Sequence, residues 1–155
     1  MSEVGGWHIR AAGGEDATAW HALRVALWPD EDDTPTLADI ARLLGHPDGY
    51  ANFLAFDATE KAIGFAEASL RRDYVNGCET SPVAFLEGWY VAPQWRDQGV
   101  GRALMNAVAA WGLACGCKEF ASDALLDSID SHRAHLACGF EETERVVYFR
   151  KRLGG

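Results

Sequence analysis

The sequence has few cysteines and none in a ligand pattern. The four cysteines among 155 residues, Cys78, Cys115, Cys117 and Cys138, form neither a C-x-x-C pair nor a Cys/His ligand spacing. This usage favours unpaired thiols in a reducing compartment, and it predicts that no metal is bound. A chain of this length buries roughly 70% of the surface that its unfolded form exposes. Neither a disulfide nor a metal is therefore needed to hold the fold.

Long apolar runs and sequence repeats are also missing. No run of about 18 apolar residues occurs, and the opening "MSEVGGWHIR" lacks a basic region followed by an apolar core. No low-complexity tract or long linker divides the chain. We therefore expect a soluble cytoplasmic protein with a single domain over residues 1–155 and no membrane partner.

Basic residues are fewer than acidic ones. The chain has 14 Lys and Arg against 23 Asp and Glu, with a formal net charge of −9. A nucleic-acid duplex needs a basic face, so this charge argues against a nucleic-acid partner. It is compatible with a cationic partner, although many soluble proteins are acidic for solubility alone.

Hydrophobic periodicity predicts an α+β fold. The expected elements are a strand at 7–12, a helix ending at Pro29, a helix ending at Gly45, a hairpin turning between Asp57 and Lys61, a strand at 83–91, a helix from about Gly99 to Ala114, a short strand in "KEFASDA", a helix closed by Gly139 and a final strand in "ERVVYFRKRL". This order is not strictly alternating, so a regular doubly wound sheet is excluded. We expect one parallel βαβ unit between Val83 and Asp123.

The run "RDQGVG" at 96–101 lies where the predicted strand passes into the helix. First-turn N–H groups of a helix have no intrahelical partner, and the helix dipole favours an anion there. Arg96 and Arg102 would add charge from the flanks. The alternative is a glycine-containing connector that binds nothing. A dinucleotide fingerprint is excluded because Leu104 stands where its third glycine is required, and a P-loop because no Gly-Lys-Ser/Thr follows.

"RDQGVG" resembles the acetyl-CoA signature Q/R-x-x-G-x-G/A of the GCN5-related N-acetyltransferase superfamily, and "ACGF" at 137–140 resembles its helix-to-strand corner. The resemblance implies a mixed sheet of about six or seven strands flanked by about four helices. It implies that residues 97–102 bind the pyrophosphate of acetyl-CoA and that the backbone of residues 89–91 pairs with the pantetheine arm. The implied acetyl-CoA-binding residues are Trp89, Tyr90, Val91, Arg96, Asp97, Gln98, Gly99, Val100, Gly101, Arg102 and Ser128. A backbone N–H near Trp89 is the implied oxyanion donor, with Gly88 permitting the bend.

Acetyl transfer to an amine requires a carboxylate or another base, because an alkyl ammonium has a pKa near 10. Strict alternation along "VAFLEGWYV" places Glu87 on one face with Phe85 and Trp89, so we expect Glu87 to be desolvated with a raised pKa or turned into a cleft. The alternative is that a bulge or a strand edge exposes Glu87 to water. Asp123 follows the neighbouring parallel strand, where ligands of such sheets usually lie. Its alternative role is to cap a turn.

The stretches "ETSPVAFLEGWYV", "EFASDALLD" and "GFEETERVVYFRKRL" resemble the aminoglycoside 6'-N-acetyltransferases, which are antibiotic resistance enzymes. The resemblance implies substrate contacts at Trp28, Tyr74, Glu87, Asp123 and Glu144. Glu87 and Asp123 are then the catalytic carboxylates, with Asp123 the preferred base, and the acetyl group passes directly to the 6'-amine.

Several points stay open at the level of sequence. Trp28 and Tyr74 have the alternative reading of ordinary core or surface aromatics. His135 stands where many superfamily members have the tyrosine that protonates the leaving thiolate, and the acid stays unassigned. The final strand "ERVVYFRKRL" is long and alternating, and the family resemblance implies that subunits pair through it, so we expect a homodimer. The alternative functions are acetylation of another small amine or of a protein amino terminus, and a non-catalytic CoA-binding sensor.

Overall fold

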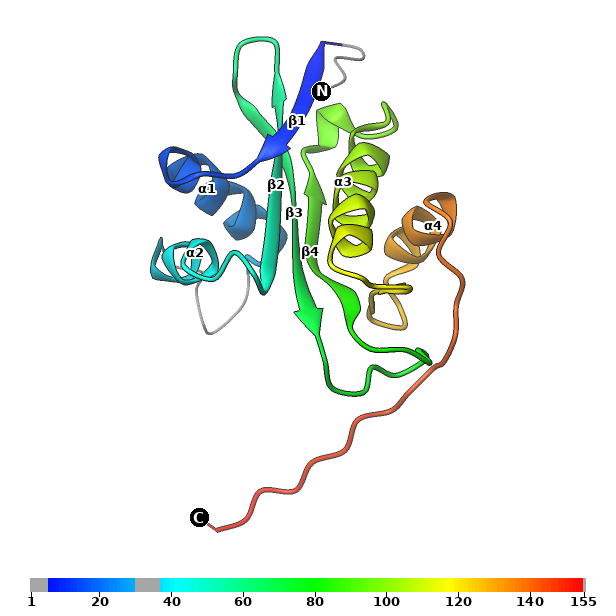
Figure 1. Cartoon of the computed structure of the whole chain (residues 1–155). Helices are drawn as coiled ribbons and strands as arrows, with labels where there is room; N and C mark the ends of the chain where they lie inside the picture. The colour runs from blue at the N-terminus through cyan, green and yellow to red at the C-terminus, as the bar shows by residue number, and fades with distance from the viewer. Residues whose placement is uncertain (1–5, 30–36, 155) are drawn as a thin grey trace. The chain divides into compact units, whose positions relative to one another are not determined.

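The computed structural model describes residues 6–29 and 37–154. The chain forms two compact units, residues 1–122 and residues 123–155, which we describe separately. The first unit contains a five-stranded sheet in the order β1-β2-β3-β4-β5 (Figure 1). Its strands are β1 (Trp7–Ala11), β2 (Tyr50–Asp57), β3 (Ala62–Arg71), β4 (Val83–Val91) and β5 (Phe120–Ala121).

Neighbouring strands from β1 to β4 are antiparallel, and β5 alone runs parallel to β4. The predicted hairpin is confirmed. The carboxylate of Asp57 accepts hydrogen bonds from the backbone N–H groups of Thr59 and Lys61, at 2.8 and 3.0 Å. These bonds and one from the Thr59 hydroxyl hold the pKa of Asp57 below its usual value. The parallel β4–β5 pair and its crossover helix are the βαβ unit expected between Val83 and Asp123.

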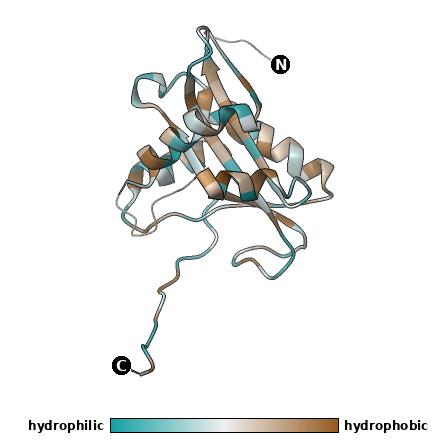
Figure 2. Ribbon diagram, turned by 90° about the vertical axis from the view of Figure 1, so that its left-hand side faces the viewer, coloured by the Kyte–Doolittle hydropathy of each residue, from teal (hydrophilic) through white to brown (hydrophobic). Residues whose placement is uncertain are grey.

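Two helices, α1 (Ala17–Leu27) and α2 (Leu37–Leu44), cover one face of the sheet (Figure 1). Figure 2 views the protein from the side of α1 and α2, and it shows hydrophilic and hydrophobic residues mixed along both helices. Their apolar stripes are buried against the strands in one cluster of Trp20, Leu23, Ile40, Leu43, Leu54, Phe56 and Phe65. The predicted start of the second helix at residues 34–36 lies outside the described residues.

The helix α3 (Val100–Ala114) covers the opposite face of the sheet (Figure 1). Its side chains Val100, Leu104 and Val108 are buried, at the spacing of one helical stripe. Gly112 lets the helix approach the sheet closely, since a Cβ added there would lie 3.0 Å from the Cβ of Ala84. Short 3₁₀ turns at Gly14–Asp16 and Pro93–Trp95 lead into α1 and toward α3.

The second unit contains the helix α4 (Ile129–Ala137). Gly139, with φ +90°, ends it in a Schellman motif, in which the N–H of Phe140 donates to the carbonyl of His135 at 3.1 Å. The predicted helix end at "ACGF" is therefore confirmed.

The predicted final strand is wrong, because the described residues 140–154 contain neither helix nor strand. Its alternating side chains favour a strand, but a strand also needs a partner for its backbone N–H and C=O groups. The sheet accordingly has five strands rather than six or seven.

Candidate active site

A β-bulge in β4 shapes the candidate site. Glu67 of β3 lies opposite Gly88 while Ala68 lies opposite Leu86, so Glu87 is the extra residue of the bulge. Beyond the bulge the side chains change faces. Trp89 lies against α3, where a Cβ added at Gly101 would be 3.2 Å from its ring. The prediction that strict alternation places Glu87 and Trp89 on one face is therefore wrong.

The bulge turns Glu87 into a polar environment. Its side chain is 36% exposed. The Ser69 hydroxyl donates to Oε1 at 2.6 Å, and Nη2 and Nε of Arg71 donate to the same oxygen at 2.8 and 3.3 Å. The Arg71 guanidinium also stacks 3.5 Å from the centroid of the Phe85 ring. Glu87 is therefore not desolvated among apolar neighbours: the bulge exposes it, as the alternative expected, and turns it into a cleft, as the other half of the prediction had it.

Glu87 opens into a cleft of about 820 Å³ bordered by α1, α2 and the strands β2 to β4. Its lining includes three cations and three carboxylates, Arg24, Arg42, Arg71, Asp39, Glu67 and Glu87. Five of these charges form ion pairs: Arg24 lies 3.7 Å from Asp39 and 2.9 Å from Glu67, and Arg71 lies 2.8 Å from Glu87. The cleft is therefore polar but close to neutral, rather than an acidic patch.

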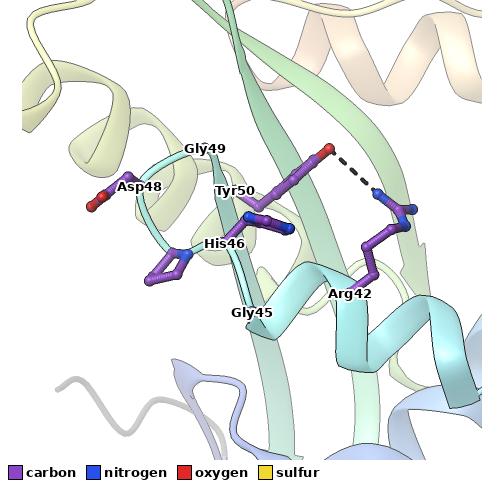
Figure 3. Close-up of a pocket in the computed structure, with 7 residues that line it drawn as sticks. Arg42, Gly45, His46, Asp48, Gly49 and Tyr50 are labelled. Atoms are coloured by element: carbon purple, nitrogen blue, oxygen red, sulfur yellow. Dashed lines mark hydrogen bonds between the residues drawn. The ribbon is translucent and has the colours of Figure 1, made fainter.

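A second hollow of about 490 Å³ shares Arg42, Gly49 and Tyr50 with the cleft. Figure 3 shows the loop between α2 and β2 that forms it, with Arg42 and Tyr50 pointing toward each other. The Arg42 Nη1 donates to the Tyr50 hydroxyl at 3.4 Å. The hollow and the cleft therefore adjoin each other at these shared residues.

Trp28 forms an aromatic wall of the cleft. It follows the end of α1 and packs edge-on against Phe65, with ring centroids 6.1 Å apart. A Cβ added at Gly88 would lie 2.7 Å from the Trp28 ring, so glycine at the bulge allows the ring to rest on the strand. Tyr74, in contrast, is 76% exposed and lies outside the lining of the cleft.

Glu67 is a site residue that sequence reasoning missed. It is only 3% exposed, and its Oε2 accepts a hydrogen bond from the Trp20 indole at 2.8 Å and pairs with Arg24. Burial raises the pKa of Glu67, and the positive charge of Arg24 opposes this shift. Arg24 in turn lies 5.2 Å from the Trp28 ring. The available signal was a single carboxylate inside the apolar strand "AIGFAEASL".

The predicted acetyl-CoA loop lies where β4 leads into α3. Gly99, with φ +87°, is the N-cap, and the N–H of Ala103 makes the first helical bond to its carbonyl at 3.0 Å. The N–H groups of residues 100–102 therefore have no acceptor within the helix. Arg96 donates from Nε to the Val91 carbonyl at 2.9 Å, which holds the loop against the end of the strand.

The open edge of β4 adjoins this loop. In the described part of the chain, β5 pairs only with Ala84 and Phe85, so the pairing on this side stops before the bulge. On its other side β4 stays paired with β3 up to Val91. Residues 89–91 thus present backbone groups beside the start of α3, an arrangement suited to an extended ligand.

Three predicted site residues belong to the second unit. Asp123 is its first residue and Ser128 is the N-cap of α4, without a side-chain capping bond. Glu144 is exposed in the segment after α4. His135, the unassigned candidate acid, has Nδ1 2.7 Å from the Ser131 carbonyl oxygen. The functional roles of these residues stay predictions.

Over residues 6–29 and 37–154 we find no cluster of three or more His, Cys, Asp or Glu side chains suited to a metal ion. Nor does any helix there have the length and apolar character needed to cross a membrane. None of the four cysteines forms a disulfide with another described residue. Burial raises the pKa of the Cys78 and Cys117 thiols, which disfavours the nucleophilic thiolate.

Comparison with known proteins identifies close relatives. The chain is 57% identical over 145 residues to an aminoglycoside N(6')-acetyltransferase type 1 of Stenotrophomonas maltophilia, covering 94% of this chain and 93% of the relative. It is 51% identical over 135 residues to the enzyme of the same name from Acinetobacter genomosp. 13, covering 87% of this chain and 91% of the relative.

Solved structures agree with these relatives. The fold matches AAC(6')-Iy in complex with the bisubstrate analogue CoA-S-monomethyl-acetylneamine, with a TM-score of 0.88, 47% identity and coverage of 95% of this chain and 99% of the other. It also matches AAC(6')-Ih from Acinetobacter baumannii, with a TM-score of 0.89, 45% identity and coverage of 96% and 100%. The model of the acetyltransferase (GNAT) family matches residues 17–140. By its loop at the start of α3, its fold and its relatives, the chain belongs to the GNAT family of acetyltransferases.

Proposed function

We propose that this protein transfers the acetyl group of acetyl-CoA to the 6'-amine of an aminoglycoside antibiotic and so confers resistance. The observation that carries the proposal is the bulge in β4. It turns Glu87 toward the cleft with its aromatic wall, while the strand continues to the anion-binding start of α3. In this proposal, β4 therefore borders both the binding site of the cationic sugar and the binding site of acetyl-CoA. The relatives with 57% and 51% identity support this assignment.

The donor site consists of backbone groups. In our proposal the N–H groups of residues 97–102 bind the pyrophosphate of acetyl-CoA, and Arg96 and Arg102 add positive charge. The edge of Trp89, Tyr90 and Val91 pairs with the pantetheine arm. Gly99, in the left-handed conformation, and Gly101, next to the Trp89 ring, fit this assignment, because neither has a side chain that could cover the N–H groups of the first turn. Ser128 is a further proposed donor contact.

Direct transfer accounts for the chemistry. The neutral 6'-nitrogen attacks the thioester carbon, the C–S bond breaks, and the thiolate leaves with its electron pair. A thiol with a pKa near 8.5 is a tolerable leaving group, so no side-chain acid is required. We propose Asp123 as the base that takes the amine proton, Glu87 as the second carboxylate near the amine, and a backbone N–H near Trp89 as the oxyanion donor.

Two of the proposed substrate contacts line the cleft, and two lie outside its lining. Trp28 offers an apolar ring face to the sugar, and Glu87 offers a carboxylate oxygen to an ammonium group. Tyr74 and Glu144 are further proposed contacts. Both are exposed in the structure, which leaves their side chains accessible to a ligand.

We also propose a single functional domain, a homodimer and a location in the cytoplasm. The family match over residues 17–140 crosses the boundary between the two units, which supports one domain. The side chains of Val147, Tyr148 and Phe149 are exposed, and burying them against a second copy would remove apolar surface from water. The absence of disulfides among the described residues is compatible with the reducing cytoplasm.

A thiol-release assay tests the proposed reaction. Acetyl-CoA is supplied with a panel of 6'-amino aminoglycosides, their 6'-hydroxy counterparts and simple diamines. We expect turnover only with the 6'-amino compounds. Glu87→Gln and Asp123→Asn should lower the rate of acetylation, whereas a non-catalytic sensor would have no rate to lose. Absence of turnover with every 6'-amino compound would overturn the substrate assignment.

A further inference from the structure

The carboxylate of Glu87 is held by one of its two oxygens. All three hydrogen bonds that the described residues make to it end on Oε1, one from Ser69 and two from Arg71. Arg71 is itself held in place by the Phe85 ring, 3.5 Å below its guanidinium. Because Ser69 and Arg71 lie two residues apart on β3, their side chains share one face of the strand.

We propose that Arg71 and Ser69 are positioning residues, which fix Oε1 of Glu87 so that Oε2 faces the cleft and receives the ammonium group of the substrate. A carboxylate on an exposed bulge would otherwise turn about its side-chain torsions. The stacked guanidinium is a planar fork, which restricts the carboxylate more than a single flexible donor does. The inference rests on the proposed function, since it assigns the substrate amine to Glu87.

The charges that line the cleft predict how the loss of Arg71 should affect substrate binding and turnover. The three cations and three carboxylates of its lining have no formal net charge, and Arg71 is a positive charge next to the proposed ammonium site. Removing that charge makes the cleft more attractive to a polycation while it releases Glu87 from its fixed orientation. Binding and turnover should therefore change in opposite directions.

The experiment compares Arg71→Gln with the wild type. Affinity for neamine is measured by calorimetry without acetyl-CoA, and kcat by thiol release. We expect neamine to bind as tightly as in the wild type or more tightly, while kcat falls about tenfold to a hundredfold, as misplacement of a reacting group by about 1 Å does. Arg71→Lys keeps the charge without the fork, and it should recover part of kcat. Ser69→Ala should lower kcat without tightening binding.

Two controls separate positioning from loss of structure. Arg72→Gln removes the charge of the residue that follows β3, outside the lining of the cleft, and should leave kcat close to that of the wild type. In a Glu87→Gln background, adding Arg71→Gln should lower kcat little further, since Arg71 acts through Glu87.

The outcomes identify which proposal fails. A wild-type protein that neither binds nor acetylates any 6'-amino compound overturns the proposed function and this inference with it. An active wild type whose Arg71→Gln variant loses affinity and keeps kcat overturns only the positioning role. The positioning role is also overturned if Arg71→Gln lowers kcat by the same factor in the wild type and in the Glu87→Gln variant. Arg71 would then act independently of Glu87.

Discussion

Gly88 is the residue at which the sheet and the aromatic wall of the cleft meet. It lies next to the bulged Glu87, and the Trp28 ring occupies the space that any side chain at this position would need. A Cβ there would be 2.7 Å from the ring of Trp28 and 3.3 Å from that of Phe65. The position of Trp28, and with it the width of the cleft, therefore depends on the absence of one methyl group.

We predict that Gly88→Ala destabilises the protein and impairs substrate binding. The added methyl group forces the Trp28 ring away from the strand, an overpacking that costs about 1–3 kcal/mol. Urea unfolding measures the stability, and the KM for the aminoglycoside measures the displacement of the wall. Gly14→Ala is the matched control, because a Cβ there meets nothing within 4 Å. Equal effects of the two substitutions would refute this explanation.

The helix α3 has the proposed donor site at its first turn and an ordinary glycine-containing turn at its end. Gly99 and Gly116 flank it with nearly the same backbone conformation, at φ +87° and +85°. A Cβ at Gly99 would meet only the Trp7 ring at 3.7 Å, and one at Gly116 would meet nothing within 4 Å. The two positions thus impose similar backbone strain, but only Gly99 adjoins the N–H groups proposed to bind pyrophosphate.

We therefore predict that Gly99→Ala and Gly116→Ala destabilise the protein to a similar extent and differ in donor binding. Each forces a non-glycine residue into a left-handed conformation, which costs about 1–2 kcal/mol. Gly99→Ala should raise the KM for acetyl-CoA severalfold because the loop relaxes away from its binding geometry. Gly116→Ala should leave that KM unchanged. A KM for acetyl-CoA that is the same in both variants would argue against the loop as the donor site.

At the scale of the whole molecule, the second unit exposes apolar side chains that its own fold does not cover. Val147, Tyr148 and Phe149 follow one another in the segment after α4, and Phe149 is 91% exposed. The described residues 140–154 form no strand, although their sequence favours one. A second copy of the chain would supply both the missing strand partner and an apolar surface.

The prediction for the whole molecule is a dimer that depends on this segment. Light scattering at micromolar concentration should give twice the mass of one chain, and Phe149→Asp should shift the mass toward that of a single chain. Leu113→Asp, at an exposed apolar residue near the end of α3, is the control and should leave the mass unchanged. A wild-type mass equal to one chain would eliminate the proposed dimer.

Short-range patterns determined much of this protein. The helix stripes, the hairpin at Asp57 and the glycine at the start of α3 all depend on neighbours within a few residues. These features are local in the chain, and sequence carries local information directly. The βαβ unit pairs β4 with a strand that follows the whole of α3, and it was predicted from the order of the elements, because parallel strands need a crossover connection. Trp28 lines the cleft, but its contact with a substrate was implied only by the resemblance to a known family and stays a prediction.

The tertiary structure alone decided the orientation of Glu87, the role of Glu67 and the state of the final segment. The bulge is a difference in register between β3 and β4, about twenty residues apart in the chain, and no alternation within β4 reveals it. Glu67 is tolerated in the core because Trp20 and Arg24 from α1 meet it there. Residues 144–153 have the composition of a strand but not its pairing, since hydrogen bonding between strands requires a partner that composition cannot specify.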